Sequence, residues 1–465
     1  MARNGPIERL RQFLRELSPQ ARALLITELE RAALRGDDVP GGDLVLQEVR
    51  NAIRDAGVDA PRIGNPARLF FRPFEAFLSS GQPKAHRPGR IPREALDPLW
   101  TWLVRDLIPH EVRLYSEDVS RALGAGEIAR ADRLVSDFQD QVAGQIRDTL
   151  AASKADDKVR RKIIAQVNIP HALQVLDEIL VVLQERDTLD LLAQRLPAHI
   201  QIFSGPDLEA VQSLLDVMTG QRPHTLRPAL VMTMRRLAAP WQLIRLALHT
   251  AGSNDLSRVT ASRFGESVTL VLTEVEDMVA ELAAELRRAG EKNVVALLKS
   301  LHDALRVLRT ELDLSVDPLA RQTAAIRTHI ADTLTAAIDP LPGRIRQMLR
   351  MRPAKEAPSS KMPEPADISE ICSLIELAKA SRNFAREFAV AELAVRVWSE
   401  LEDSLDVHTR ALIASFRGED PHHDHRHAQF QAALRFAALI FGQDHASRLS
   451  RSAELAAAER KAAAG

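Results

Sequence analysis

One short stretch near the C-terminus, GEDPHHDHRHAQF (residues 418–430), contains four histidines and is the part of the sequence that most suggests a functional site such as a metal site. We expect Asp420 to cap a helix and Pro421 to occupy its first turn, where proline lacks only a donor that would be unpaired anyway. His423 and His427 then lie four residues apart on one helix face, within reach of a shared metal ion. No carboxylate stands at a diagnostic spacing for a third ligand. The favoured interpretation is therefore a solvated or packed helix start, with a metal site as the alternative.

A second group of candidate functional residues lies between positions 62 and 93, a segment that contains seven cationic side chains and a single acidic one, Glu75. Phenylalanines at 70, 71, 74 and 77 interleave with them, and cations beside aromatic rings suit anionic lipid, single-stranded nucleic acid or an acidic partner. The candidate anion-binding residues are Arg68, Arg72, Lys84, Arg87, Arg90 and Arg93. The favoured alternative is that the phenylalanines pack inward and the loop of residues 81–93 is solvated.

Motifs with a known catalytic geometry are absent from the sequence. It contains no glycine-rich phosphate loop, no Gly-x-Ser-x-Gly elbow and no His-Glu-x-x-His helix. The acidic positions Glu274, Asp277, Glu281 and Glu285 share a predicted helix, but a two-metal centre in a bundle needs Glu-x-x-His on partner helices. We therefore expect no enzymatic activity, no catalytic residue and no cofactor.

The composition of the 465-residue chain points to an intracellular, water-soluble protein. The net charge is -1, so no global field draws the chain to nucleic acid or membrane. The single cysteine, Cys372, excludes an internal disulfide and fits a reducing compartment. No apolar run approaches the roughly 20 residues that span a bilayer, and the N-terminus lacks a signal peptide. We expect a cytoplasmic location.

The segments that carry the candidate functional residues show the periodicity of α-helices along most of the chain. Apolar residues recur at three- and four-residue steps, as in Leu173, Leu176, Leu180 and Leu183. Aromatic residues make up only 4% of the chain, and the abundant Leu, Ala, Arg and Glu favour helix. Helix starts are marked by Asp-Pro pairs at 97–98, 317–318, 339–340 and 420–421. We predict an all-α protein.

The predicted helices vary in length, and the longest indicate an elongated architecture. Long helices are expected at 127–153, 226–250 and 257–289, and two separate ones at 170–185 and 187–195. The expected fold is an elongated multi-helix bundle followed by a smaller domain that resembles a helical-hairpin repeat.

Composition shifts suggest where this chain is divided. Residues 351–368 contain four prolines and no apolar periodicity, which is typical of a flexible linker. A shorter proline- and glycine-rich break follows residue 80. The predicted organisation is an N-terminal helical segment at 1–80, a long-helix bundle at 92–350, the linker at 351–368 and a helical-repeat-like domain at 369–465.

The last hundred residues contain segments that are similar to each other in sequence. The segment 388–398 resembles 430–441, with Phe388 and Ala391 matching Phe430 and Ala433 at an offset of 42. The segments 406–416 and 444–455 are similar at an offset of 38. Paired helices with small residues at close-approach positions suggest a repeat with a period near 40.

These residues resemble the tetratricopeptide repeat, particularly a longer form with Gly-x-Asp-His between paired helices, here Gly442-Gln-Asp444-His445. Gly442 would end one helix and Asp444 would cap the next. The resemblance covers roughly residues 369–460, and an unrelated alanine-rich hairpin domain is an equal alternative. If it holds, it implies a surface that binds another protein.

The functional prediction is a non-enzymatic interaction or scaffolding protein that holds a partner helix or peptide in a helical groove. The candidate groove residues are Phe388, Ala391, Phe430 and Ala433. Self-association of the long helices is a second predicted interaction. One alternative is a peripheral binder of anionic membrane or nucleic acid through residues 62–93. A second alternative is a metal-dependent protein that uses residues 422–427.

Overall fold

The computed structural model describes residues 65–79, 86–287, 294–313, 317–351, 362–418 and 422–464, with isolated positions before residue 50. These residues are overwhelmingly helical, which confirms the all-α prediction. The two strands present there, β1 (Leu78–Ser79) and β2 (Ile91–Pro92), form one short parallel pair. No helix within the described ranges is long and apolar enough to cross a membrane.

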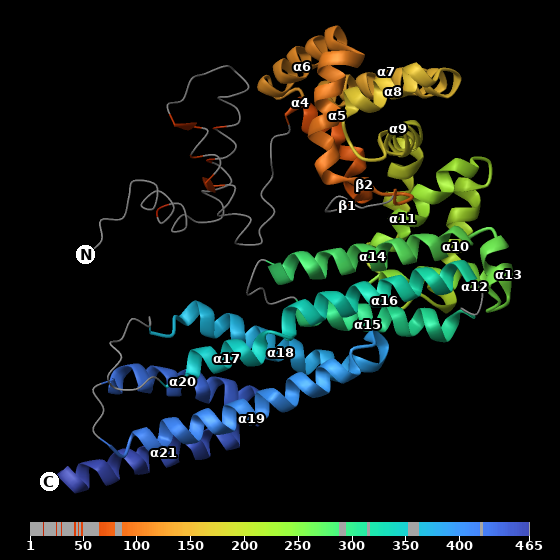
Figure 1. The fold of residues 1–465 in the computed structure, drawn as a ribbon. Coiled ribbons are helices and arrows are strands. Elements are labelled where there is room, and N and C mark those ends of the chain that lie inside the picture. The colour runs from red at the N-terminus through yellow and green to blue at the C-terminus, as the bar shows by residue number, and fades with distance from the viewer. Residues whose placement is uncertain are drawn as a thin grey trace. The chain divides into compact units, whose positions relative to one another are not determined.

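The chain divides into two compact units, drawn in Figure 1. Unit 1 comprises Met1–Pro197 and Val211–Arg235, and unit 2 comprises Ala198–Ala210 and Arg236–Gly465. Each unit is therefore assembled from two separate stretches of sequence.

The helices of unit 1 begin with a short α-helix that continues as a 3₁₀ turn. They are α4 (Pro66–Phe71), η1 (Arg72–Phe77), η2 (Arg93–Ala95), α5 (Leu96–Trp102), the π-helical η3 (Leu103–Leu107), α6 (Pro109–Gly124), α7 (Ile128–Ala155), α8 (Asp157–Val167) and α9 (Ala172–Arg195). They are followed by α10 (Gly205–Thr219), η4 (Pro223–Thr225) and α11 (Leu226–Arg236), of which α10 and α11 contribute residues to both units.

Unit 2 is built from helices that follow one another closely. They are η5 (Pro240–Leu243), α12 (Ile244–Ala251), α13 (Leu256–Ala261), α14 (Glu266–Arg287), α15 (Val294–Glu311), α16 (Asp317–Ile338), α17 (Leu341–Leu349), α18 (Pro365–Phe388), α19 (Ala391–Ser415), α20 (His423–Ile440) and α21 (Gln443–Ala464).

The core of unit 1 forms where α7 packs between its neighbours α6, α8 and α9. Apolar residues recur along one face of α7, from Val135 through Phe138 and Val142 to Ile146, and all are buried. The ring of Tyr115 on α6 stacks on Phe138 with centroids 4.0 Å apart, and its hydroxyl donates to the carbonyl oxygen of Pro66.

The phenylalanines of the basic segment belong to this same core. Phe70, Phe74 and Phe77 are fully buried, and the Phe70 ring meets that of Phe138 edge-on at 5.5 Å. They pack inward, as the favoured alternative expected, because α4 and η1 lie against α6, α7 and α9.

Unit 2 is a layered array in which α14, α15 and α16 lie side by side (Figure 1). α18 packs against both α15 and α16 and also contacts α17, α19 and α20. The two final hairpins, α18–α19 and α20–α21, stack on each other. α18 begins at Pro365, inside the predicted linker of residues 351–368, and it belongs to the same compact unit as α17. Residues 352–361 lie outside the described part. The division into domains at that linker stays a prediction about independent folding.

Two of the longest predicted helices are each interrupted. The predicted helix 226–250 breaks into α11, η5 and α12, since Pro240 cannot donate within a helix and holds Ala239 in an extended conformation. The predicted helix 257–289 breaks between α13 and α14, where a Cβ on Gly265 would lie 2.2 Å from the carbonyl oxygen of Thr260. In contrast, the helices expected at 170–185 and 187–195 are one continuous helix, α9.

The segments that echo each other in sequence do not occupy equivalent places in the hairpins. Residues 388–398 span the junction of α18 and α19, where Ala389 adopts a left-handed conformation, whereas residues 430–441 lie almost wholly within α20. Residues 406–416 end α19, whereas residues 444–455 begin α21. The two hairpins stack in chain order, but the similar sequence segments do not occupy equivalent positions in them.

Candidate functional site

A pocket in unit 1 brings several polar side chains together at a concave surface. It lies between β1, the segment from His86 to Pro98 and the turn that joins α8 to α9. It encloses about 560 Å³ of space between protein atoms, including solvent at its open side. Its apolar wall consists of Pro92, Ala95, Pro98, Ile169, Pro170 and Val175, and its polar wall of Ser79, His86, Arg87, Arg90, Asn168 and His171. Glu94 is the one carboxylate among the described lining residues.

Local backbone geometry brings these groups together. Asn168 ends α8 in the left-handed region with φ 51°, and His171 precedes α9 with φ 54°. Pro170 stands between them, so the chain turns sharply between the two helices. On the opposite side, β1 and β2 pair in parallel and align Ser79 with Pro92. Left-handed conformations at residues other than glycine carry a small energetic cost and are frequent at functional sites.

Next to the pocket, the carboxylate of Glu178 on α9 interacts with the segment of residues 86–89 and with Arg227 on α11. It accepts a hydrogen bond from the Gly89 backbone N–H at 2.9 Å and another from the Arg227 guanidinium at 3.1 Å. The His86 Nε2 atom lies 3.9 Å from the same carboxylate. Burial raises the pKa of Glu178 and outweighs the opposing effect of Gly89 and Arg227.

The imidazole of His86 sits in an environment that disfavours positive charge. Burial, together with the nearby His171 and Arg227, lowers its pKa, so the ring is neutral near pH 7. Its ring centroid lies 6.4 Å from that of His171. Within the described residues, neither His86 Nε2 nor the Ser79 hydroxyl has a hydrogen-bond partner, although both atoms are buried.

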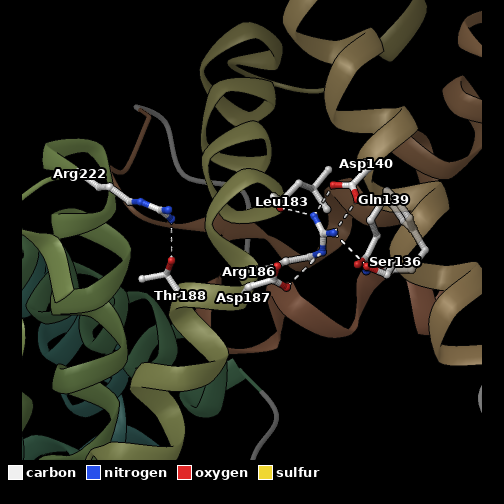
Figure 2. Close-up of polar contacts among 9 residues, drawn as sticks. Ser136, Gln139, Asp140, Leu183, Arg186, Asp187, Thr188 and Arg222 are labelled. Carbon is white, nitrogen blue, oxygen red and sulfur yellow. Dashed lines mark hydrogen bonds and ion pairs between the residues drawn. The ribbon is translucent and has the colours of Figure 1, made fainter. Parts of the chain in front are cut away.

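A second buried polar cluster joins α7 to α9 and has a structural role. Figure 2 shows Arg186 on α9 reaching toward Asp140 and Ser136 on α7. Its guanidinium donates to both Asp140 carboxylate oxygens, at 2.7 and 2.9 Å, to the Ser136 hydroxyl and to the Leu183 carbonyl oxygen. Such a bidentate pair fixes both the distance and the orientation of the two helices. Nearby, Arg222 donates to Thr188 at 2.9 Å.

The six predicted anion-binding residues do not act as one exposed patch. Arg72 pairs with Asp132 and Arg93 with Glu75, both at the surface. Arg90 is only 1% exposed and belongs to the pocket lining. Arg87 lies beside it in the same lining, whereas Arg68 is exposed on α4 and Lys84 lies outside the described residues.

The histidines of the opening stretch lie at the start of α20. The rings of His423 and His427 are nearly parallel, with centroids 6.4 Å apart. Asp424 is fully exposed, and its carboxylate is 3.7 Å from His423 Nδ1. No set of three or more potential metal ligands occurs in the parts of the chain that are described. Glu419 and Asp420 do not belong to those parts.

Three of the four predicted groove residues are internal. Phe388, Phe430 and Ala433 are at most 3% exposed, and only Ala391 is exposed. The Phe430 ring packs edge-on against Phe416 at 5.4 Å, which closes the space that a partner would need. These residues hold the hairpins together rather than forming a groove.

Sequence reasoning missed the pocket because its residues come from distant positions. One signal was present: α9 is apolar on most of its faces, so the charged residues Glu178, Glu185 and Arg186 had to be buried. Comparison with known protein families, with curated proteins and with solved structures finds no match. Function must therefore be argued from the geometry of this chain.

Proposed function

We propose that this chain is a non-enzymatic interaction protein that binds a helix or extended peptide of another protein along its stacked hairpins. The packing of α18–α21 carries the proposal. Besides the contacts within each hairpin, α18 contacts α20 and α19 contacts α21, so equivalent helices stack in two rows. Helical-repeat proteins use the extended surfaces that such stacking creates to bind partners.

Exposed aliphatic side chains on one of these rows support the same conclusion. Val395 and Val407 on α19 are 64% and 62% exposed, and Leu455 on α21 is 66% exposed. Covering a large aliphatic side chain is worth about 1.5–3 kcal/mol. The partner surface that we propose is therefore the outer side of α19 and α21, instead of the internal positions Phe388, Phe430 and Ala433.

Affinity capture with surface variants tests this proposal. The variant Val395→Asp/Val407→Asp/Leu455→Asp changes only exposed side chains and should fold normally. Its matched control is Ile128→Asp/Ile164→Asp, which alters exposed isoleucines of unit 1. We expect the first variant to lose proteins that the wild type and the control both recover in quantitative mass spectrometry. Sedimentation of the purified proteins reveals whether the partner is a second copy of the chain.

An unchanged set of recovered proteins and an unchanged oligomeric state in the triple variant would overturn the proposal. The alternatives gain no support from the geometry. Of the candidate cations of residues 62–93, Arg72 and Arg93 form surface ion pairs, and Arg87 and Arg90 line a pocket. The histidines of α20 have no third metal ligand among the described residues.

A further inference from the structure

The described lining of the unit 1 pocket contains more cationic than anionic side chains. Arg87 and Arg90 contribute two guanidiniums, while Glu94 contributes one carboxylate. Glu178 lies below and is already engaged by Gly89 and Arg227. A guanidinium as buried as Arg90, at 1% exposure, makes its surroundings favourable to an anion because little water screens it.

Two further polar atoms at the pocket offer hydrogen bonds that no described residue takes up. These are the Ser79 hydroxyl and His86 Nε2, and both are shielded from solvent. Buried polar groups are nearly always hydrogen-bonded, and a group left without a partner is a candidate for contact with a ligand. The Ser79 side chain belongs to a residue that is only 7% exposed, so it is part of the interior and not of a mobile surface.

The remaining wall sets the shape and polarity of a ligand. Prolines at 92, 98 and 170 make it rigid, and Ile169 and Val175 make it aliphatic. Because the space of about 560 Å³ includes open solvent at the mouth, the enclosed part is smaller, which suits a small molecule rather than a nucleotide or an extended cofactor.

We propose that this pocket binds a small aliphatic carboxylate, with its carboxylate toward Arg87, Arg90, His86 and Ser79 and its alkyl group against the proline-rich wall. This function is independent of the partner binding proposed for α19 and α21. An aliphatic anion matches both halves of the lining, whereas an inorganic anion matches only the polar half.

Binding should be coupled to protonation of His86. Among the groups around this ring, His171 and Arg227 oppose its protonation and Asp177 favours it, while the Glu178 carboxylate lies 3.9 Å from Nε2. An added carboxylate favours the imidazolium form, so binding takes up a proton. Affinity should therefore rise as the pH falls from about 7.5 to about 6, where the ligand itself stays ionised.

Isothermal titration calorimetry of the full chain with isovalerate tests the proposal. Isovaleramide provides a neutral isostere, and inorganic phosphate provides an anion without an alkyl group. We expect saturable binding of isovalerate, and about tenfold weaker binding of either comparison compound, since each lacks one half of the interaction. The variants Arg87→Gln and His86→Gln should each weaken isovalerate binding about tenfold.

The matched control is Arg93→Gln, which removes an exposed arginine of the same segment that pairs with Glu75 outside the pocket. It should bind isovalerate as the wild type does. A second readout needs no variant: isovalerate should shift the imidazole NMR signals of His86 and His171. Absence of saturable binding, equal binding of isovaleramide, tighter binding of phosphate, or equal losses in all three variants would overturn the proposal.

Discussion

Two pairs of imidazole rings in this protein have the same centroid separation, 6.4 Å, in very different surroundings. His423 and His427 are one helical turn apart in the sequence and sit at the start of α20 in unit 2. His86 and His171 are far apart in the sequence and meet above a buried carboxylate in unit 1. The first pair owes its distance to helix geometry alone, whereas the second depends on the packing of two loops.

This difference shows why spacing alone is a poor guide to chemistry. A four-residue step on a helix brings the two rings close together. These rings, however, lie at the start of α20, where Asp424 is fully exposed to water. Burial lowers the pKa of His86 and raises that of Glu178, so it favours the neutral form of each group. Perturbed groups in a concave site are better functional candidates than a histidine-rich stretch.

The largest expected effect comes from removing the Glu178 carboxylate near the His86–His171 pair. Glu178→Ala leaves the buried Gly89 N–H and the Arg227 guanidinium without this acceptor. We expect a loss of about 3 kcal/mol in the free energy of unfolding, measured by urea denaturation. Glu178→Gln retains an acceptor and should lose less. A Glu178→Ala protein as stable as the wild type would contradict this account of the buried site.

A somewhat smaller effect is expected for the second buried cluster of unit 1. Arg186→Met should lower the free energy of unfolding by about 2 kcal/mol, because the side chain of Asp140 is 65% exposed and can be solvated after the change. The exposed helix pair of Arg161 and Asp157 provides the control. Arg161→Met should leave stability nearly unchanged in the same urea titration. Equal effects of the two substitutions would remove the distinction between buried and exposed charge.

The pH dependence of stability distinguishes the two histidine pairs more finely. Because the pKa of His86 is lowered in the folded state, the unfolded chain binds a proton there more readily. Stability should therefore fall as the pH drops below the ordinary histidine value of 6.5, by at most about 1.4 kcal/mol per pH unit. His86→Gln should remove this contribution, visible as a flatter dependence of the unfolding free energy on pH between about 7 and 5. An unaltered slope would place His86 in an ordinary aqueous environment.

The smallest effect is expected for the sequence-adjacent pair. The double substitution His423→Ala/His427→Ala should change the free energy of unfolding by no more than about 0.5 kcal/mol, since surface substitutions rarely do more. The same protein tests metal binding: zinc content after dialysis should equal that of the wild type. Stoichiometric zinc in the wild type alone would instead restore the metal-site alternative.

The sequence predicted much of the fold and little of the candidate site. The predicted helix 127–153 agrees with α7 (Ile128–Ala155) to within two residues, and α16 begins at the predicted Asp317-Pro318 start, because period and caps are local signals. The interruptions at Pro240 and Gly265 were missed because apolar periodicity continues across them. The groove residues failed for a different reason, since periodicity marks Phe388 and Phe430 as apolar but does not distinguish a core from a groove.

The sequence by itself determined the all-α class and most helix limits, because these follow from interactions within a few residues. Only the tertiary structure decided which polar residues meet. It joined Ser79, His86 and Arg90 to His171 and buried Glu178 beneath them, while it left the four histidines of α20 at a helix end. The physical reason is that burial and long-range proximity depend on how helices pack, and no local pattern in the chain encodes those contacts.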